Sequence, residues 1–308
     1  MFRIAVTIYA ALGFLACSSA TSPHKVTVTL SGAPYGLAVS PSGVVYVTLA
    51  STGMIARADL PATSFSPVAV VGSVPTAVTF NASGTRAYVT NQFSRTVSVL
   101  DPASNTILHV IPVTGDPFGV RVAPGDSVLW VTTNADSVYA LRLGTDSVVA
   151  VFPTGSASNG VVLADTFAYV STLSSGTVIE INTRSYTVSR VFNVGGTPQE
   201  LVLSPDGAVL YIANESGAVQ FWDLATGTSA GLVVLPGGGG FGLARNPANG
   251  RLYVSTSYFG RAVHEIDPVT RAIVRTIATD GSPRRIAFDA TGSLALVTNE
   301  SGWIDVIR

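Results

Sequence analysis

The sequence predicts an all-β fold, a seven-bladed β-propeller with four antiparallel strands in each blade. Three observations predict it. A motif recurs along the chain at intervals of 39 to 43 residues, each repeat contains four short β-rich runs, and the two ends of the chain carry complementary incomplete repeats. A period of about 40–45 residues with four strands per unit is typical of propeller blades.

The repeat is clearest in residues 87–102, AYVTNQFSRTVSVLDP, which read as a strand, a loop and a second strand. One position, aromatic in six of the seven repeats, recurs at spacings of 42, 42, 39, 42, 42 and 43 residues. The short interval falls where residues 163–169 lack the Gly-bearing turn of most other repeats, which predicts a tighter hairpin there. The seven marker residues are Tyr46, Tyr88, Trp130, Tyr169, Tyr211, Tyr253 and Leu296.

Each repeat divides into four runs separated by turn residues. The second run is the Tyr-Val-Thr stretch, and the fourth is apolar and ends in Gly, as in 109–115. The third ends in Asp or Asn, as at Asp101 and Asp267, where the side chain can close an Asx-turn. The first run begins at Pro in five repeats: 34–39, 75–80, 117–122, 198–203 and 283–288.

The two ends of the chain fix the number of blades. Residues 25–32 match a fourth run without the three runs that should precede it, and residues 304–308 match a third run without a fourth. Pairing them completes a seventh blade and removes the unpaired strand edges that an open ring would leave. We therefore expect residues 25–308 to form one closed domain, although a length of 308 residues is also compatible with two.

The repeat motif resembles that of a known family. The sequence YVTN at 88–91, with partial copies at 46–48, 211–214, 253–255 and 296–299, is similar to the YVTN-repeat (YncE-like) β-propellers. The resemblance covers about residues 25 to 308 and implies the propeller fold. It does not select one function, because it spans surface-layer proteins, extracytoplasmic binding proteins and lactonase-like relatives.

The composition of the chain excludes several classes of protein. Hydrophobic residues make up 47% of the chain and charged residues 11%, which suits blades covered on both faces by their neighbours. The β-rich runs of mostly five to seven residues are too short for a membrane barrel, whose strands need about 9–11. With 17 basic and 18 acidic residues and no run of Lys or Arg, the chain is not expected to bind nucleic acid.

The N-terminus predicts export. Arg3 precedes an apolar run of signal-peptide length, 4–16. This run leads into FLAC, which resembles a bacterial lipobox with Phe in place of the usual Leu and predicts lipid attachment at Cys17, the only cysteine. The alternative is ordinary export with cleavage nearby, for instance after Ala20. A single cysteine excludes an internal disulfide. The expected organisation is a signal peptide at 1–16, a polar tether at 17–24 and the propeller at 25–308.

The topology predicts where a ligand would bind. Links from fourth to first strands and from second to third strands lie at one end of the ring, here called the top. Residues just inside the start of each first strand should therefore ring the upper mouth of the channel. Glu200 and Arg285 are expected to meet near the channel, with Arg284 and Arg121 nearby. Two hypotheses remain open there, a pocket with a mixed-charge floor and an aromatic rim, or a structural ion pair between Glu200 and Arg285 that plugs the channel. The ligand-binding candidates are Tyr35, Phe118, Gln199, Glu200, Phe241, Arg284 and Arg285.

The loops at the top also carry aromatic side chains, a residue type enriched at interface centres. The alternative is that these rings pack inward as loop anchors. The partner-binding candidates are Phe93, Tyr258, Phe259 and Trp303. The bottom turns are regular, and we expect little specificity from them.

The sequence predicts no catalytic residue, metal or cofactor. His24, His109 and His264 do not lie within metal-ligand spacing of one another. The Gly-rich stretch 235–241 carries no Lys and does not read as a phosphate loop. No nucleophile elbow is present.

We therefore expect a monomeric, exported, non-catalytic binding or scaffold protein of the bacterial cell envelope. It would be periplasmic or at the outer membrane or cell surface, touch the membrane only through its lipid anchor, and engage a protein or envelope ligand through its top face. The competing hypothesis is a lactonase-like or lyase-like enzyme, with Glu200 as general base and Arg284 or Arg285 as anion stabiliser. The third hypothesis is a passive envelope scaffold without a small-molecule site.

Overall fold

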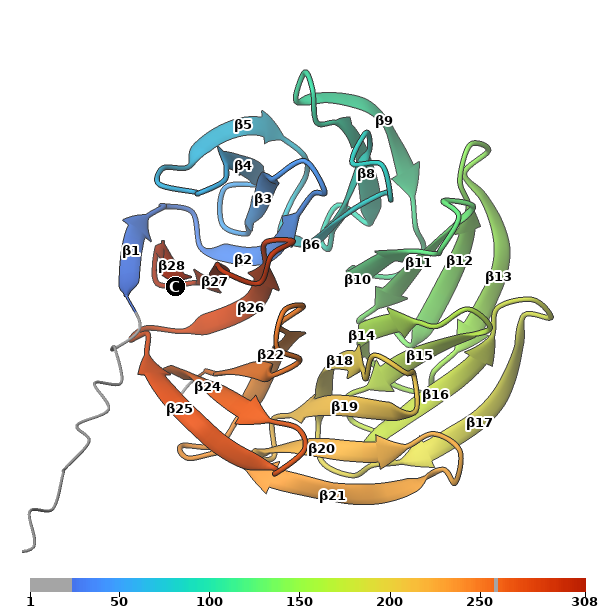
Figure 1. Ribbon diagram of the computed structural model, residues 1–308. Coiled ribbons are helices and arrows are strands. Elements are labelled where there is room, and N and C mark those ends of the chain that lie inside the picture. The colour runs from blue at the N-terminus through green and yellow to red at the C-terminus, as the bar shows by residue number, and fades with distance from the viewer. Residues whose placement is uncertain (1–23, 258–259) are drawn as a thin grey trace, which may run out of the picture.

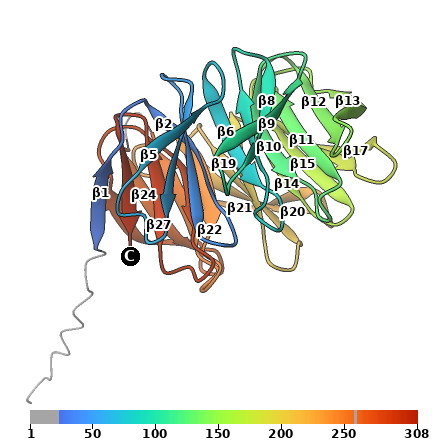
Figure 2. The same cartoon turned by 90° about the horizontal axis from the view of Figure 1, so that it is seen from above.

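The computed structural model describes residues 24–257 and 260–308, and all regular secondary structure in these residues is β-strand. Seven four-stranded antiparallel sheets are arranged as blades around a ring (Figure 1). Seen from the side, the strands span the thickness of the ring (Figure 2). The predicted seven-bladed β-propeller is confirmed. These residues contain no helix of the length and apolarity needed to cross a membrane.

Equivalent strands have similar lengths in all seven blades, as the repeat predicts. The first, innermost strands are β2 (Pro34–Val39), β6 (Pro75–Phe80), β10 (Pro117–Val122), β14 (Ser158–Leu163), β18 (Pro198–Leu203), β22 (Gly240–Arg245) and β26 (Pro283–Phe288). The second strands are β3 (Val44–Leu49), β7 (Ala87–Asn91), β11 (Val128–Thr133), β15 (Phe167–Thr172), β19 (Val209–Asn214), β23 (Leu252–Thr256) and β27 (Ala295–Asn299). The third strands are β4 (Met54–Asp59), β8 (Thr96–Asp101), β12 (Ser137–Arg142), β16 (Thr177–Asn182), β20 (Ala218–Asp223), β24 (Ala262–Asp267) and β28 (Trp303–Ile307). The fourth strands are β5 (Ser66–Val70), β9 (Thr106–Pro112), β13 (Ser147–Pro153), β17 (Thr187–Asn193), β21 (Thr228–Val234), β25 (Ala272–Ala278) and β1 (Lys25–Thr29).

The N-terminal strand closes the ring. β1 pairs antiparallel with β28, in a register that runs from Lys25 opposite Ile307 to Thr29 opposite Trp303. In Figure 1 this blue strand lies at the outer edge of the blade formed by the red C-terminal strands. The Thr27 hydroxyl donates a hydrogen bond of 2.9 Å to the buried Asp305 carboxylate. The predicted closure, in which the N-terminal strand completes the last blade, is confirmed.

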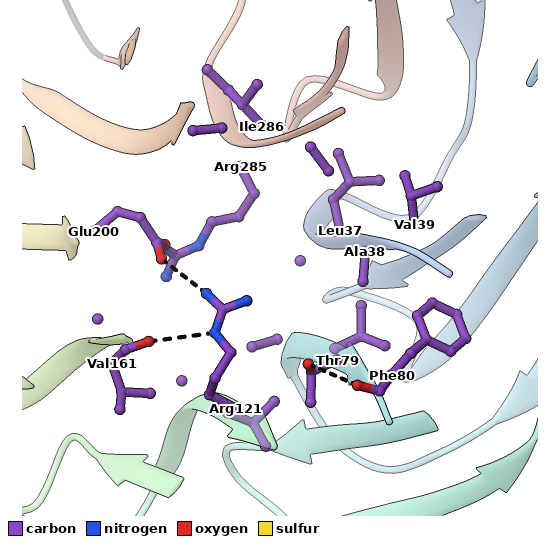
Figure 3. Close-up of a pocket in the computed structure, with 18 of the residues that line it drawn as sticks. Leu37, Ala38, Val39, Thr79, Phe80, Arg121, Val161, Glu200, Arg285 and Ile286 are labelled. Atoms are coloured by element: carbon purple, nitrogen blue, oxygen red, sulfur yellow. Dashed lines mark hydrogen bonds and ion pairs between the residues drawn. The ribbon is translucent and has the colours of Figure 1, made fainter. Parts of the chain in front are cut away.

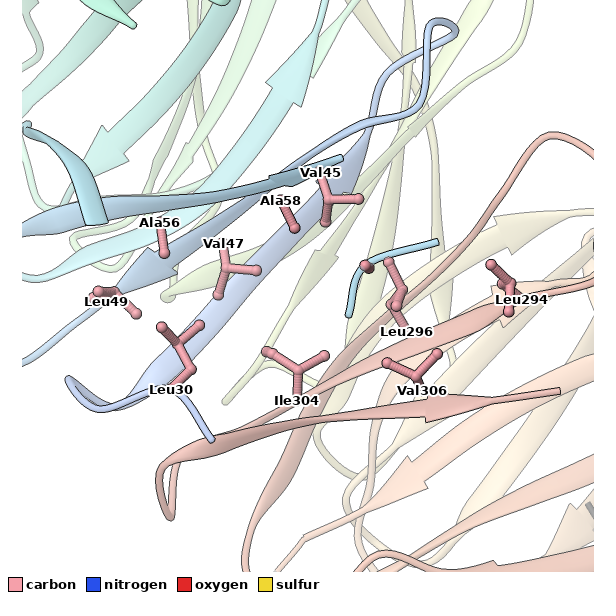
Figure 4. Packing of buried hydrophobic residues seen from close by; sticks show 11 residues of the cluster. Leu30, Val45, Val47, Leu49, Ala56, Ala58, Leu294, Leu296, Ile304 and Val306 are labelled. Carbon is pink, nitrogen blue, oxygen red and sulfur yellow. The ribbon is translucent and has the colours of Figure 1, made fainter. Parts of the chain in front are cut away.

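A separate hydrophobic cluster fills each of the seven junctions between neighbouring blades. Between blades one and seven, Val47 of β3 faces Leu296 of β27 and Ile304 of β28, and all three are fully buried (Figure 4). The high apolar content of the chain therefore reflects sheets that are packed on both faces.

In five of the blades, a Thr or Ser of the repeat motif connects its blade to the next by a side-chain hydrogen bond. Every first strand is bulged near its third residue, which frees a backbone N–H. In blade three, the Thr132 hydroxyl accepts the Gly119 N–H at 2.8 Å and donates to the Asn159 carbonyl of blade four at 2.8 Å. Blade five has Ala213 at this position. Hydroxyls that make the same two kinds of hydrogen bond belong to Thr90, Ser171, Ser255 and Thr298.

In the four blades where the third residue of the first strand is Gly, the next blade approaches too closely to leave room for a Cβ atom. A Cβ atom added to Gly36 would lie 2.6 Å from the Thr76 carbonyl oxygen. The same addition at Gly119, Gly160 or Gly242 would bring the atom still closer to the carbonyl oxygen of the next blade. Glu200 and Arg285 occupy this third position in blades five and seven, and both residues line the channel cavity.

Candidate functional site

Three aromatic rings cover the upper mouth of the channel. The Tyr35 ring contacts Phe118 edge-on, with centroids 5.9 Å apart, and contacts Phe241 in the same manner at 6.0 Å. These side chains come from β2, β10 and β22, so the contacts span non-adjacent blades. The predicted rim residues therefore meet one another above the channel.

Arg284 belongs to this cover. Its guanidinium carbon lies 4.7 Å from the centre of the Phe241 ring and 5.5 Å from that of Tyr35, within the range of cation–π contact. The Nε atom donates to the Glu300 carboxylate at 2.6 Å. Arg284 is therefore engaged in the top cover.

A polar network lies beneath the rings and links blades seven, five and four. Arg285 Nη1 pairs with the Glu200 carboxylate, and Nη2 donates to Asn159 Oδ1 at 2.6 Å. The Asn159 amide in turn donates to the Gln199 side-chain oxygen. The structure thus brings Glu200 and Arg285 together, and Gln199 reaches them through Asn159.

Arg121 of β10 extends across the channel toward this network (Figure 3). Its Nη2 atom lies 3.5 Å from Glu200 Oε1, and its Nε atom donates to the Val161 carbonyl at 3.4 Å. The side chain keeps 45% of its surface accessible, compared with 13% for Glu200 and 10% for Arg285. Arg121 therefore lies inside the ring yet remains open to solvent in the channel.

The sequence analysis expects Arg121 near Glu200 and Arg285 but does not include it among the ligand-binding candidates. The signal that distinguishes Arg121 is its position in the repeat. The fifth residue of the first strand lines the channel cavity in six of the seven blades, all but blade four. In the blades other than blade three, this residue is Ala, Val or Thr. Those residues are Ala38, Thr79, Val162, Val202, Ala244 and Ala287.

The charged groups in the channel do not balance. Burial lowers the pKa of Arg285 to about 10, an effect that Tyr35 opposes and the positive charge of Arg121 reinforces. Arg285 therefore remains charged at neutral pH. Two guanidinium groups face one carboxylate, Glu200, which leaves the cluster with one surplus positive charge.

A cavity of about 470 Å³ lies below the aromatic rings and beside this cluster. Its lining runs down the first strands from Gly36 and Gly119 to Pro41 and Asn81, which belong to turns of the bottom face. The rings of Tyr35, Phe118 and Phe241 do not line it. The cavity is thus covered at the top and extends to the bottom.

The partner-binding candidates have different environments. Phe93, in the link between β7 and β8, is 66% exposed. Trp303 is partly buried, and its indole N–H donates to the Asp305 carboxylate at 3.1 Å, which anchors the ring. Tyr258 and Phe259 lie outside the described residues, as does Cys17.

Within the described ranges, no three His, Cys, Asp or Glu side chains come together as a metal site would require. His264 is buried in blade six, where its Nδ1 atom lies 2.9 Å from the Thr276 hydroxyl. Burial lowers its pKa, which favours the neutral ring. His109 pairs with Asp146 at 2.9 Å on the outer face of the ring.

The fold has solved counterparts. Over 92% of this chain and 97% of the other, the structure matches a chain of the Kuenenia stuttgartiensis hydrazine synthase with a TM-score of 0.80 at 19% sequence identity. At this identity the likeness defines the class of fold, a β-propeller. No protein-family model and no curated protein matches the sequence.

Proposed function

We propose that this protein is an exported, non-catalytic binding protein of the bacterial cell envelope, which engages a protein or envelope ligand through its top face. The observation that carries the proposal is the aromatic cover, in which Tyr35 contacts both Phe118 and Phe241 across the channel mouth. A covered mouth presents a continuous surface, whereas small ligands prefer concave sites. A continuous surface suits a macromolecular partner.

Phe93 is the strongest single contact candidate on that surface. It is a large apolar side chain that is mostly exposed, on a top loop that also carries Arg95. Aromatic and Arg side chains are enriched at interface centres. We include the other three partner-binding candidates, Tyr258, Phe259 and Trp303, in the proposed surface; Trp303 is the first residue of β28.

The contacts of Glu200 favour binding over catalysis. As a general base, Glu200 would have to accept a proton from a substrate. Its two carboxylate oxygens face Arg285 and Arg121 instead. The enzyme hypothesis offers Arg284 or Arg285 as anion stabiliser, but Arg284 is engaged with Glu300 and Arg285 with Glu200.

Site-specific photocrosslinking in cells tests the top-face proposal. A photoreactive amino acid replaces Phe93 at the top or, as a matched control, Val269, which is 90% exposed in a bottom turn. We expect discrete crosslinked adducts from position 93 and none from position 269. Adducts from position 269 alone, or from neither position, would overturn the proposal.

Export and lipid attachment are tested separately. Cys17→Ser is expected to release the protein from the membrane fraction into the soluble extracytoplasmic fraction. A wild-type protein that is already soluble outside the cytoplasm refutes lipid attachment and leaves the top-face proposal standing. Retention in the cytoplasm refutes export.

A further inference from the structure

We propose that the channel cavity binds a small organic monocarboxylate, which enters from the bottom face and whose carboxylate is held by Arg121. This site is separate from the top-face surface proposed above. It would bind its ligand without a reaction, and none of the residues of the aromatic cover takes part.

The charges that line the cavity favour an anionic ligand. The charged residues that line the cavity are Arg121, Arg285 and Glu200. Glu200 is paired directly with Arg285 and reaches Arg121 only at 3.5 Å. An incompletely compensated charge that is surrounded by protein favours a counter-ion, because the ring excludes much of the water that would otherwise solvate it. One surplus positive charge selects a monoanion.

Arg121 has the hydrogen-bonding capacity to hold a carboxylate. A guanidinium group has five N–H donors in a fixed fork that matches a carboxylate. Arg121 makes two polar contacts, to Val161 and Glu200, and both are long at 3.4 and 3.5 Å. Since 45% of the side chain remains accessible, donors are available to a ligand in the cavity.

The size and the lining of the cavity suit a small organic ligand. Its volume of about 470 Å³ lies within the range of about 300–1,000 Å³ usual for small-molecule sites. At the level of Arg121 the channel is lined by small apolar side chains from four other blades, which suit a short hydrocarbon body. These residues are Ala38, Val202, Ala244 and Ala287.

Isothermal titration calorimetry of the purified full chain tests this inference, with butyrate as the probe. Butyramide has the same size without the charge, and inorganic phosphate has charge without the hydrocarbon body. Arg121→Gln removes the proposed ligand-binding group. Arg142→Gln is the matched control, because Arg142 lies on the same blade but does not line the cavity.

We expect butyrate to bind at one site per chain, at least about tenfold more tightly than butyramide or phosphate. Arg121→Gln should weaken butyrate binding by about tenfold or more, as expected for the loss of a charge-assisted contact. Arg142→Gln should leave it unchanged. Arg121→Lys retains the charge without the fork and should show a smaller loss, which covers the case in which Arg121→Gln folds poorly.

Three results would overturn the inference. They are no binding of butyrate to the wild-type chain, equal binding of butyramide or phosphate, and unchanged butyrate binding in a folded Arg121→Gln variant.

Discussion

The hydroxyl that ties one blade to the next can be removed without changing the shape of the side chain. Thr132→Val replaces the hydroxyl with a methyl group at a position that is completely buried. The change deletes two hydrogen bonds of 2.8 Å and leaves the Gly119 N–H and the Asn159 carbonyl without this partner. A buried polar group that loses its partner costs about 1–3 kcal/mol. We therefore expect the free energy of unfolding to fall by about 2–4 kcal/mol.

Thermal and urea unfolding of wild type and of Thr132→Val measure this loss of stability. The apparent Tm should fall by an amount on the order of 5 °C. Thr132→Ser is the matched control. Blade four uses Ser171 in the same role, with hydrogen bonds of 2.8 Å to the Gly160 N–H and 2.6 Å to the Gln199 carbonyl. The serine variant should stay within about 1 kcal/mol of wild type. A valine variant as stable as the serine variant would refute a stabilising role for the hydroxyl.

Three further predictions concern stability and titration. Burial raises the pKa of Asp305, so this carboxyl group holds its proton more tightly in the native state than in the unfolded state. Wild type should therefore lose stability relative to Asp305→Asn as the pH rises from 4 to 7. A difference in Tm between the two proteins that does not change with pH contradicts this prediction. Burial raises the pKa of Tyr46 to about 12, so stability should fall as the pH rises above 10, and absorbance near 295 nm should show delayed tyrosine ionisation that unfolding in guanidinium abolishes. Gly242→Ala should lower the apparent Tm more than Gly144→Ala, because a Cβ on Gly242 meets the Arg284 carbonyl oxygen whereas Gly144 is open and suffers only from its positive φ; equal losses would show that the blade contact yields easily.

The fold could be predicted from the sequence because each blade repeats the same local solution. The marker spacing, the Pro that opens the first strands and the turn residues act within a single repeat. Asp101 and Asp267 indeed accept N–H groups two residues ahead, from Ala103 and Val269. The closure of the ring could also be predicted, because residues 25–32 match a fourth strand and need the C-terminal third strand to pair with.

The candidate site could be predicted only in part, because it depends on side chains that cross the ring. The repeat shows that Glu200 and Arg285 occupy the third position of their first strands. Because this position lies next to the channel, contact between the two side chains could be predicted. The repeat does not show which rotamers the aromatic side chains adopt, so the contacts of Tyr35 with Phe118 and Phe241 above the channel could not be predicted. Arg121 was recognisable in principle as the charged member of the fifth position, but its reach toward Glu200 depends on the channel width.

Both proposals require a channel that is covered above and open below. The position of a bound heavy-atom ligand tests this geometry most directly. The measurement is a crystal structure of the protein with 4-bromobutyrate, in which anomalous scattering locates the bromine. We predict a single bromine peak inside the cavity, between Arg121 and the bottom turns that contain Pro41 and Asn81, with Tyr35 still in contact with Phe118 and Phe241. A peak at the top, among separated aromatic rings, would contradict the account.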